Sequence, residues 1–170
     1  MAGQEKWKET EETVRRYGNM VYRLAFARTG SRSDADDIFQ EVFFRYVRKA
    51  PDFAEEEHKK AWLLKVTVNC SAKFMTSFWK KRVGLFAEEK EAAGGAKEQG
   101  YERAEENLMM QRELMRLPEK YRVAIHLFYY EELGTEQIGK ITGQKPSAVR
   151  AQLTRARRML KERMEAAEDV

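Results

Sequence analysis

Apolar residues recur at three- and four-residue intervals along most of the chain, which is the pattern of amphipathic α-helices. In the amino-terminal part this pattern predicts a helix over about residues 10–29 and a second from about Asp34 until Pro51 stops it. A third stretch, over about residues 55–82, is expected to be two helices or one helix with a bend near Asn69. The patterns predict an all-α fold.

The composition changes between the two halves of the chain. Residues 87–100 are rich in Glu, Lys, Ala and Gly and have almost no large apolar residue, which is typical of a linker. The sequence therefore predicts two small helical domains, residues 1–85 and residues 105–170, joined by a flexible linker over residues 86–104.

The last part of the chain predicts a helix-turn-helix that follows a helix over about residues 119–130. A short helix with Thr135 as its N-cap leads to a turn at Gly143 and to a second helix with Ser147 as its N-cap. The apolar residues Ile138 and Ile141 of the short helix are expected to face inward.

The second of these helices has an apolar stripe, formed by Val149, Leu153, Ala156 and Leu160 at intervals of four, three and four residues. Such a helix fits the major groove of DNA, where arginines contact guanine edges or phosphates and a small residue permits close approach. The candidate DNA contacts are Lys145, Ser147, Arg150, Ala151, Thr154, Arg155, Arg157 and Arg158. The alternative interpretation is a charged helix in an ordinary bundle.

Charge supports nucleic-acid binding, although the net charge of the chain is only +4. Residues 59–82 contain seven basic residues and no acidic one, and residues 145–163 contain seven basic residues and one acid, Glu162. Two basic blocks are the pattern expected of a polyanion-binding protein with two contact points. Solvated basic faces are also common on helical proteins, so charge alone leaves both interpretations open.

In the carboxy-terminal half, three segments resemble the domain of bacterial RNA polymerase sigma factors that binds the −35 promoter element. These segments are residues 117–122, 132–139 and 149–157. The turn differs from the family pattern, because Ser147-Ala148 stands where Gly-Thr is usual. The resemblance therefore implies duplex DNA binding but leaves the preferred promoter sequence open.

The amino-terminal half carries an independent resemblance to the same family. Residues 34–43 are similar to the helix by which sigma factors bind the polymerase clamp, and Trp62-Leu63 followed by Asn69 resembles the segment that opens the −10 element. Two domains with a short linker resemble the extracytoplasmic-function (ECF) group. The resemblance implies a promoter-specificity subunit that binds core RNA polymerase and promoter DNA.

The acidic cluster of the second helix favours protein over DNA as its partner, because DNA repels negative charge. The candidate contacts to core RNA polymerase are Asp34, Asp37, Gln40, Glu41 and Phe44. Acids that only cap the helix would explain Asp34 and Asp37, but not the whole cluster.

The basic block over residues 59–82 suits single-stranded DNA, since basic residues that can bind phosphates alternate with aromatic ones. The candidate −10 contacts are Lys65, Asn69, Lys73, Lys80, Lys81 and Arg82. The resemblance places Asn69 near the pocket for an extruded base, although Lys73 stands where the family often has an acid. Trp62 and Phe74 fall on the apolar stripe and are expected in the core.

No enzyme chemistry is expected, and no metal, cofactor or small-molecule substrate. His58 and His126 lie in different predicted domains, and neither a phosphate-binding loop nor a metal-ligand spacing occurs. The single cysteine, Cys70, is expected to be a buried structural thiol rather than a redox group. Without a membrane-spanning apolar run or a signal-peptide core, the expected compartment is the cytoplasm.

The resemblance also implies an anti-sigma factor as a partner that masks the two domains, and no stable homo-oligomer is expected. Two other classes remain open from the residues alone. One is a repressor or activator that binds its operator as a dimer, and the other is a helical adaptor that binds only protein.

Overall fold

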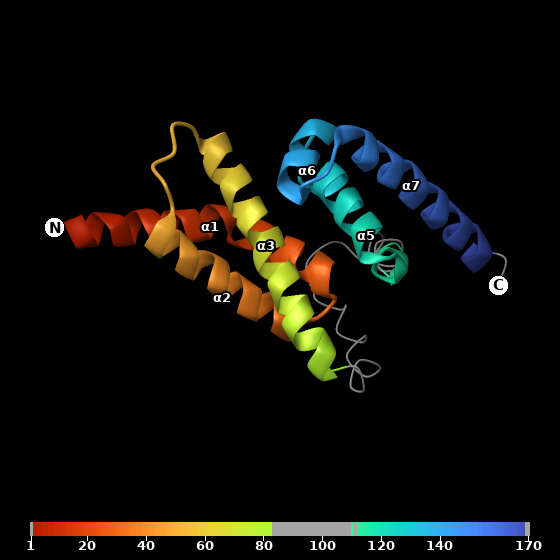
Figure 1. The fold of residues 1–170 in the computed structure, drawn as a ribbon, viewed down its shortest axis with the longest axis horizontal. Helices are drawn as coiled ribbons and strands as arrows, with labels where there is room; N and C mark the ends of the chain where they lie inside the picture. The colour runs from red at the N-terminus through yellow and green to blue at the C-terminus, as the bar shows by residue number, and fades with distance from the viewer. Residues whose placement is uncertain (1, 83–109, 111, 169–170) are drawn as a thin grey trace. The chain divides into compact units, whose positions relative to one another are not determined.

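The computed structural model describes residues 2–82, 110 and 112–168. The chain divides into two compact units, Met1–Lys81 and Arg82–Val170, which are described separately below. Every regular element of the described residues is a helix (Figure 1), which confirms the predicted all-α fold. The predicted linker, residues 86–104, lies outside the described residues, so the predicted domain limits remain predictions.

The first unit contains three helices, α1 (Ala2–Thr29), α2 (Arg32–Lys49) and α3 (Glu56–Arg82). Helix α2 packs along α1. All three helices supply apolar side chains to the core, among them Val21, Leu24, Ala25, Ile38, Val42, Leu63 and Leu64. Burial of this apolar surface is the main source of stability of the unit.

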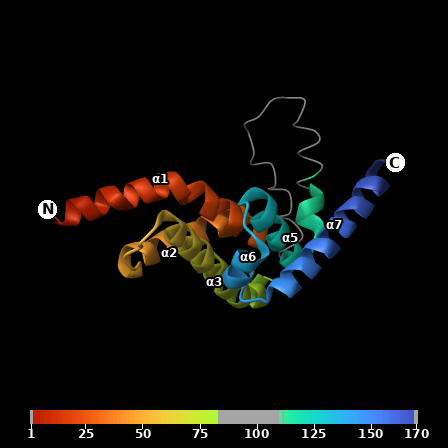
Figure 2. The same cartoon turned by 90° about the horizontal axis from the view of Figure 1, so that it is seen from above.

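The helix limits in this unit differ from the predicted ones. Helix α1 begins at Ala2 instead of about residue 10, and its first turns extend past α2 in both views (Figures 1 and 2). Residues 3–9 are all exposed, so no apolar periodicity marks this part of the helix. Helix α3 is one continuous helix, which excludes the alternative of two helices; the predicted bend near Asn69 stays a prediction.

The second unit contains α5 (Glu119–Ile125), the π-helix η2 (His126–Tyr130), α6 (Thr135–Thr142) and α7 (Pro146–Glu168). Residues 112–116 before them are also helical. Helix α7 packs against both α5 and α6. The predicted helix over residues 119–130 exists, but its last five residues form the wider π turn.

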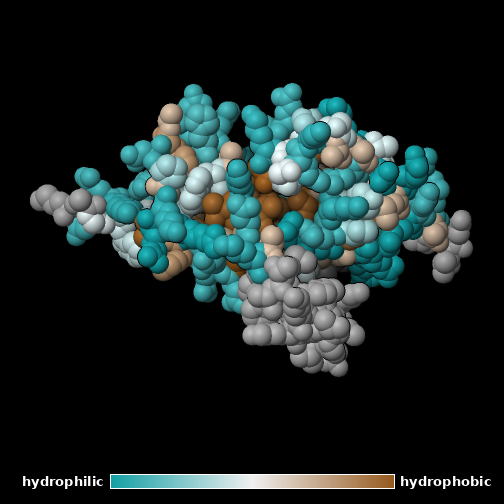
Figure 3. Space-filling view, in the orientation of Figure 1, coloured by the Kyte–Doolittle hydropathy of each residue, from teal (hydrophilic) through white to brown (hydrophobic). Residues whose placement is uncertain are grey.

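Hydrophilic side chains make up most of the surface seen in the space-filling view (Figure 3). Of the helices that the structure describes, none has a stretch sufficiently long and apolar to cross a membrane. The candidate binding residues lie on the polar surfaces of α2, α3 and α7.

Candidate nucleic-acid and protein interfaces

The connection between α6 and α7 is a tight turn that depends on two glycines. Gly143 follows α6 with a φ of 72°, in the left-handed region that favours glycine, as predicted. The amide of Gln144 donates to the carbonyl oxygen of Gly139 over 2.8 Å. A Cβ atom on Gly139 would lie only 2.5 Å from the carbonyl oxygen of Gln144, so glycine alone fits there. This requirement was not predicted, and the only sequence signal of it is a glycine inside a helical pattern.

Both helices of the helix-turn-helix begin earlier than predicted. Gly134, not Thr135, is the N-cap of α6, and its amide donates to Oε1 of Gln137 over 3.1 Å. Helix α7 begins at Pro146, because proline suits a first turn in which its missing N–H group would have no partner. Ser147 therefore lies inside α7 and is not its N-cap.

Helix α7 has a buried side and an exposed side, as its periodicity predicts. Val149, Leu153 and Ala156 are buried against the rest of the unit. The predicted −35 contacts are all exposed, and these are Lys145, Ser147, Arg150, Ala151, Thr154, Arg155, Arg157 and Arg158. Apart from Lys145, which directly precedes the helix, they belong to one helix and form a continuous polar surface.

The exposed residues of α7 point in two main directions, because successive residues are about 100° apart around a helix. Ala151 and Arg158 lie opposite the buried stripe. Arg150, Arg157 and Lys161 lie along one flank, since they are separated by seven and four residues. We call these three residues the basic flank of α7.

Two of the predicted arginines have tyrosine partners, one on η2 and one on α5. Nε of Arg157 donates to the hydroxyl oxygen of Tyr129 over 2.6 Å. The Arg157 guanidinium carbon also lies 5.4 Å from the ring centroid of Phe128 and 5.5 Å from that of Tyr129. A hydrogen bond with Arg155 lowers the pKa of Tyr121. Attraction between a guanidinium and aromatic faces favours one position of the Arg157 side chain before a ligand binds.

In the first unit, one exposed side of α2 carries four of the predicted polymerase contacts. They are Asp37, Gln40, Glu41 and Phe44, at spacings of three, one and three residues. Phe44 is 55% exposed, and the guanidinium of Arg48 lies 5.3 Å from its ring centroid. The carboxylate of Glu41 accepts a hydrogen bond from Nε of Arg45 over 3.0 Å. An exposed aromatic ring thus lies among charged and amide groups, and we call these four residues the α2 surface.

The fifth predicted polymerase contact, Asp34, does not belong to the α2 surface. Its side chain is buried, and its amide donates to Oγ of the N-cap residue Ser31 over 3.3 Å. A carboxylate in the first turn is favoured by the partial positive charge at the helix amino terminus. Asp34 is therefore enclosed at the beginning of α2, away from the α2 surface, and its contact with polymerase stays a prediction that we do not carry into the proposal below.

Helix α3 presents Lys65, Asn69 and Lys73 on one exposed side, because they are four residues apart. Lys80, Lys81 and Arg82 belong to the same helix, but their side chains, like that of Phe74, lie outside the described residues. Trp62 packs edge-on against Tyr46 and Phe53, with ring centroids 6.0 Å and 5.9 Å away, but it is only half-buried and so lies at the border of the core in which it was predicted.

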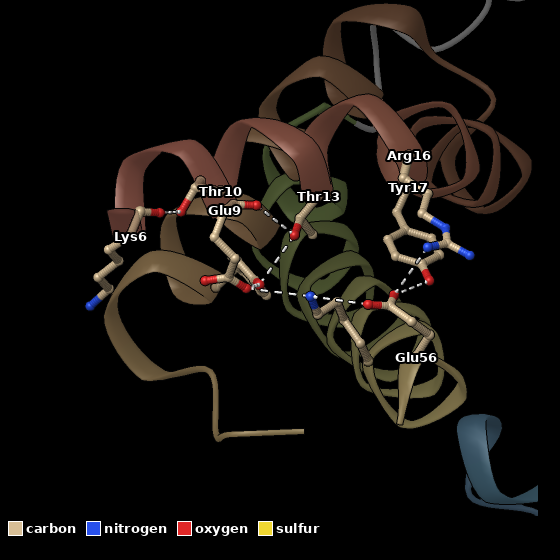
Figure 4. A network of polar contacts seen from close by, with 9 residues as sticks. Lys6, Glu9, Thr10, Thr13, Arg16, Tyr17 and Glu56 are labelled. Carbon is tan, nitrogen blue, oxygen red and sulfur yellow. Dashed lines mark hydrogen bonds and ion pairs between the residues drawn. The ribbon is translucent and has the colours of Figure 1, made fainter. Parts of the chain in front are cut away.

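A network of polar side chains fixes α3 against α1 and α2 (Figure 4). The hydroxyl of Tyr46 on α2 donates to Oε1 of Glu9 on α1 over 2.5 Å, and Nζ of Lys59 on α3 donates to the same oxygen over 3.3 Å. On α1, the hydroxyl of Tyr17 donates to Oε2 of Glu56 on α3 over 2.7 Å. The network holds the beginning of α3, whose later turns carry the candidate −10 contacts.

The hydrogen bonds of the network favour the charged carboxylates. Donation from Tyr46 lowers the pKa of Glu9, and donation from Tyr17 lowers the pKa of Glu56. The partners are 37 and 39 residues apart in the sequence, so local patterns gave no signal of the network.

Neither a metal centre nor a reactive thiol is evident in the described parts of the chain. No group of His, Cys, Asp and Glu side chains in residues 2–82, 110 and 112–168 is arranged to hold a metal ion. Cys70 is buried, and burial raises the pKa of its thiol, so the less reactive protonated form is favoured. This environment agrees with the structural role predicted for Cys70.

Together, a helix-turn-helix with a basic exposed helix and a separate three-helix unit define an all-helical DNA-binding protein. Family models identify both units, since residues 13–80 match Sigma-70 region 2 and residues 107–160 match Sigma-70, region 4. The chain belongs to the family of RNA polymerase sigma factors, in its ECF group.

Individual relatives support this assignment. The chain is 30% identical to RNA polymerase sigma factor SigV of Bacillus subtilis, with 82% of this chain and 81% of SigV covered. It is also 30% identical to the ECF RNA polymerase sigma-E factor of Haemophilus influenzae, with 89% and 85% covered. A third relative, ECF RNA polymerase sigma factor SigE of Mycolicibacterium smegmatis, is 30% identical, and the chain spans 60% of its length.

Solved structures share the fold. The sigma factor RpoE in complex with the anti-sigma factor NepR from Bartonella quintana is 20% identical, with a TM-score of 0.74 and coverage of 93% of this chain and 98% of that chain. CnrH in complex with the cytosolic domain of CnrY is 19% identical, with a TM-score of 0.65 and coverage of 94% and 90%.

Proposed function

We propose that this chain binds core RNA polymerase and directs promoter-specific transcription initiation, with the α2 surface on polymerase, α3 on the −10 element and α7 on the −35 element. The observation that carries the proposal is the contrast between two exposed helix surfaces. The α2 surface combines carboxylates with an exposed aromatic ring, whereas α7 presents arginines around a small residue. The first chemistry suits a protein partner and the second suits DNA.

The −35 duplex is the proposed ligand of α7. The small Ala151, opposite the buried stripe, permits close approach of the helix backbone to the floor of the major groove. Ser147, Thr154, Arg155 and Arg158 surround it and supply donors to base edges or phosphates, and Lys145 adds a cation at the helix start. Arg150 and Arg157, on the basic flank, face the phosphates that border the groove.

The −10 element is the proposed ligand of α3. Lys65 and Lys73 lie one helical turn on either side of Asn69, on the same exposed side. An amide group between two cations suits a strand whose phosphates are bound while one base is held by hydrogen bonds. We include Lys80, Lys81 and Arg82 as phosphate contacts because their charge continues the same basic block.

Core RNA polymerase is the proposed partner of the α2 surface. The Phe44 ring supplies apolar area, Gln40 supplies both donor and acceptor, and Asp37 and Glu41 attract a basic protein surface. This surface faces away from the core of the unit, so binding requires no unfolding.

Control by an anti-sigma factor is the proposed regulation. RpoE and CnrH, which share this fold, were solved in complex with the anti-sigma factor NepR and with the cytosolic domain of CnrY, respectively. We propose that a protein of this class binds the present chain in the cytoplasm and covers surfaces needed for polymerase or DNA. Affinity capture of the chain from its native host, compared with capture in the presence of excess core polymerase, tests this regulation.

Run-off transcription with purified core RNA polymerase on a promoter library tests the central proposal. We expect transcripts that begin at a defined distance from shared −10 and −35 sequences, and only when the chain is added. The isolated chain should bind the same promoters weakly, because polymerase raises the effective concentration of each DNA-binding unit. Tight dimeric operator binding without polymerase, together with no initiation, would overturn the proposal in favour of a stand-alone regulator.

A further inference from the structure

The contact between Arg157 and Tyr129 points to a DNA-binding residue outside α7. We propose that Tyr129 is a positioning residue for DNA, which holds Arg157 toward a backbone phosphate and donates its own hydroxyl proton to that phosphate. The proposal rests on the −35 function proposed for α7 and extends the DNA-binding surface to η2, to which the sequence patterns assign no DNA contact.

The direction of the hydrogen bond leaves donors available on both side chains. Arg157 donates through Nε, so the bond occupies a lone pair of the Tyr129 hydroxyl oxygen and not its proton. A guanidinium has five N–H groups, and four remain on Arg157 after this bond. Tyr129 is 51% exposed and Arg157 is exposed, so both sets of donors are accessible to an anion.

The position of Arg157 on α7 identifies phosphate as the anion. Arg157 belongs to the basic flank, together with Arg150 and Lys161, about 90° from the outward side that carries Ala151 and Arg158. When the outward side of a helix faces the floor of the major groove, its flanks face the phosphates that line the groove. The basic flank thus forms a row of cations along one DNA strand, with Arg157 between the other two.

Tyr129 lowers the entropic cost of this phosphate contact. A free arginine side chain has many rotamers, and most are lost when it binds a ligand. The aromatic faces of Phe128 and Tyr129, with the 2.6 Å hydrogen bond, restrict Arg157 before DNA arrives. A restrained guanidinium binds phosphate more tightly than a free one with the same charge.

The neighbouring Tyr130 provides a matched control. It is 53% exposed, close to the value for Tyr129, but its ring stacks on His126 with the centroids 5.3 Å apart. Removal of either hydroxyl changes the surface of η2 by one oxygen atom. Only the Tyr129 change removes the hydrogen bond to Arg157.

Binding of the full chain to a fluorescein-labelled −35 duplex, measured over a range of salt concentrations, tests the proposal. The duplex is the one recovered from the transcription experiment above. We expect Tyr129→Phe to weaken binding about 2- to 10-fold, the usual range for one hydrogen bond, and Tyr130→Phe to leave it unchanged. The plot of log affinity against log salt falls with salt. Arg157→Ala should make its slope less negative by about 0.9, the value for one phosphate contact, and Tyr129→Phe should give a slope between those of the wild type and Arg157→Ala.

A double-mutant cycle separates positioning from an independent effect. In the Arg157→Ala background, Tyr129→Phe should weaken binding by a smaller factor than in the wild type. Equal factors in both backgrounds overturn the proposal. A wild-type salt slope for Tyr129→Phe, combined with a lower melting temperature of the second unit, also overturns it, because those results indicate a purely structural bond. Failure of the wild-type chain to bind the duplex with or without polymerase would instead overturn the proposed −35 function itself.

Discussion

The α2 surface of the first unit and the exposed side of α7 in the second unit carry opposite charge. On α2 the exposed side has Asp37, Glu41 and an exposed ring, while the exposed side of α7 has arginines and a small residue. Both helices bury one apolar side in a similar way, so their folding does not distinguish them. Under the proposed function, partner choice therefore resides in a few exposed positions on otherwise equivalent amphipathic helices.

The units also differ in what holds their binding helices in place. In the first unit, side chains from three helices meet in an ionic network that includes Glu9, Tyr46 and Lys59. In the second unit, the turn before α7 depends on the backbone, where Gly139 contacts Gln144 without a side chain between them. The ionic network is sensitive to pH and salt, and the turn is sensitive to an added methyl group.

The largest expected effect comes from reversing charge on the α2 surface. The double change Asp37→Lys and Glu41→Lys should abolish binding to core polymerase, because like charges opposite a basic surface cost several kcal/mol (on the order of 3 or more). Binding to duplex DNA should not weaken. Pull-down with core polymerase and DNA anisotropy measure the two effects.

Asp36→Lys is the control, since Asp36 is also exposed on α2 but lies about 90° from the centre of the α2 surface. If it weakens polymerase binding as much as the double change, the assignment of the α2 surface is wrong.

Addition of one methyl group at Gly139 should give the next largest effect. Gly139→Ala places a Cβ atom against the backbone of Gln144, so the second unit should lose about 3 kcal/mol of stability. All three tryptophans, Trp7, Trp62 and Trp79, lie in the first unit. Circular dichroism should therefore detect a lower melting temperature, whereas tryptophan fluorescence should not.

Gly134→Ala is the matched control for this change. A Cβ atom at Gly134 meets only the Gln137 side chain at 4.0 Å, so the expected cost is about 1 kcal/mol or less. Equal melting temperatures for the two variants would show that the turn tolerates the added atom.

Loss of a single arginine from α7 should have an effect of similar or smaller size. Arg155→Ala should weaken binding of the −35 duplex by about 1–3 kcal/mol if a base is contacted, without weakening binding to polymerase. Lys140→Ala, a change at an exposed cation of α6, is the control and should have less effect. DNA affinity that is insensitive to both Arg155→Ala and Arg150→Ala would support a protein-binding adaptor instead.

The smallest expected effect is acid sensitivity of the first unit. The pKa of Glu9 is lower in the folded chain than its ordinary value of 4.5, because Tyr46 donates to the carboxylate. Folded protein therefore gains stability from this group above about pH 4.5 and loses it as the pH falls through the lower folded pKa. Glu9 is half exposed, so the gain should be less than about 1 kcal/mol.

Tryptophan fluorescence during acid titration measures this effect. Glu9→Gln should reduce the acid sensitivity, whereas Glu12→Gln, at an exposed position of the same helix, should leave it unchanged. Identical titration curves for wild type and Glu9→Gln would show that the network does not contribute to the pH dependence of stability.

The buried side of each helix was predictable from the sequence, since the spacing of apolar residues along that one helix determines it. The buried stripe of α7, the inward position of Ile138 and the turn at Gly143 all agree with the structure. Helix ends were less predictable. Ser147 has the chemistry of an N-cap, but Pro146 starts α7 first, and the polar start of α1 has no apolar stripe to mark it.

Contacts between distant residues were not predictable from spacing. Asp34 was assigned to the polymerase surface because of its charge, whereas its burial depends on how α2 packs in the first unit. The partners Tyr129 and Arg157 are 28 residues apart, and the Glu9 and Tyr46 pair is 37 residues apart. Each pair forms only after helices pack, and no local pattern specifies it.

The π-helix η2 has a consequence for how related chains can diverge. The amide of Glu131 donates to the carbonyl of His126, five residues earlier, so this turn contains one residue more than an α-helical turn needs. Deletion of one residue here would rotate Tyr129 by about 100° relative to α5, while the residues of α7 that face the bases would keep their identity and phase. Under the role proposed for Tyr129, insertion or deletion of a single residue in η2 would therefore change the affinity of this chain for the DNA backbone, while the residues that face the bases stay the same.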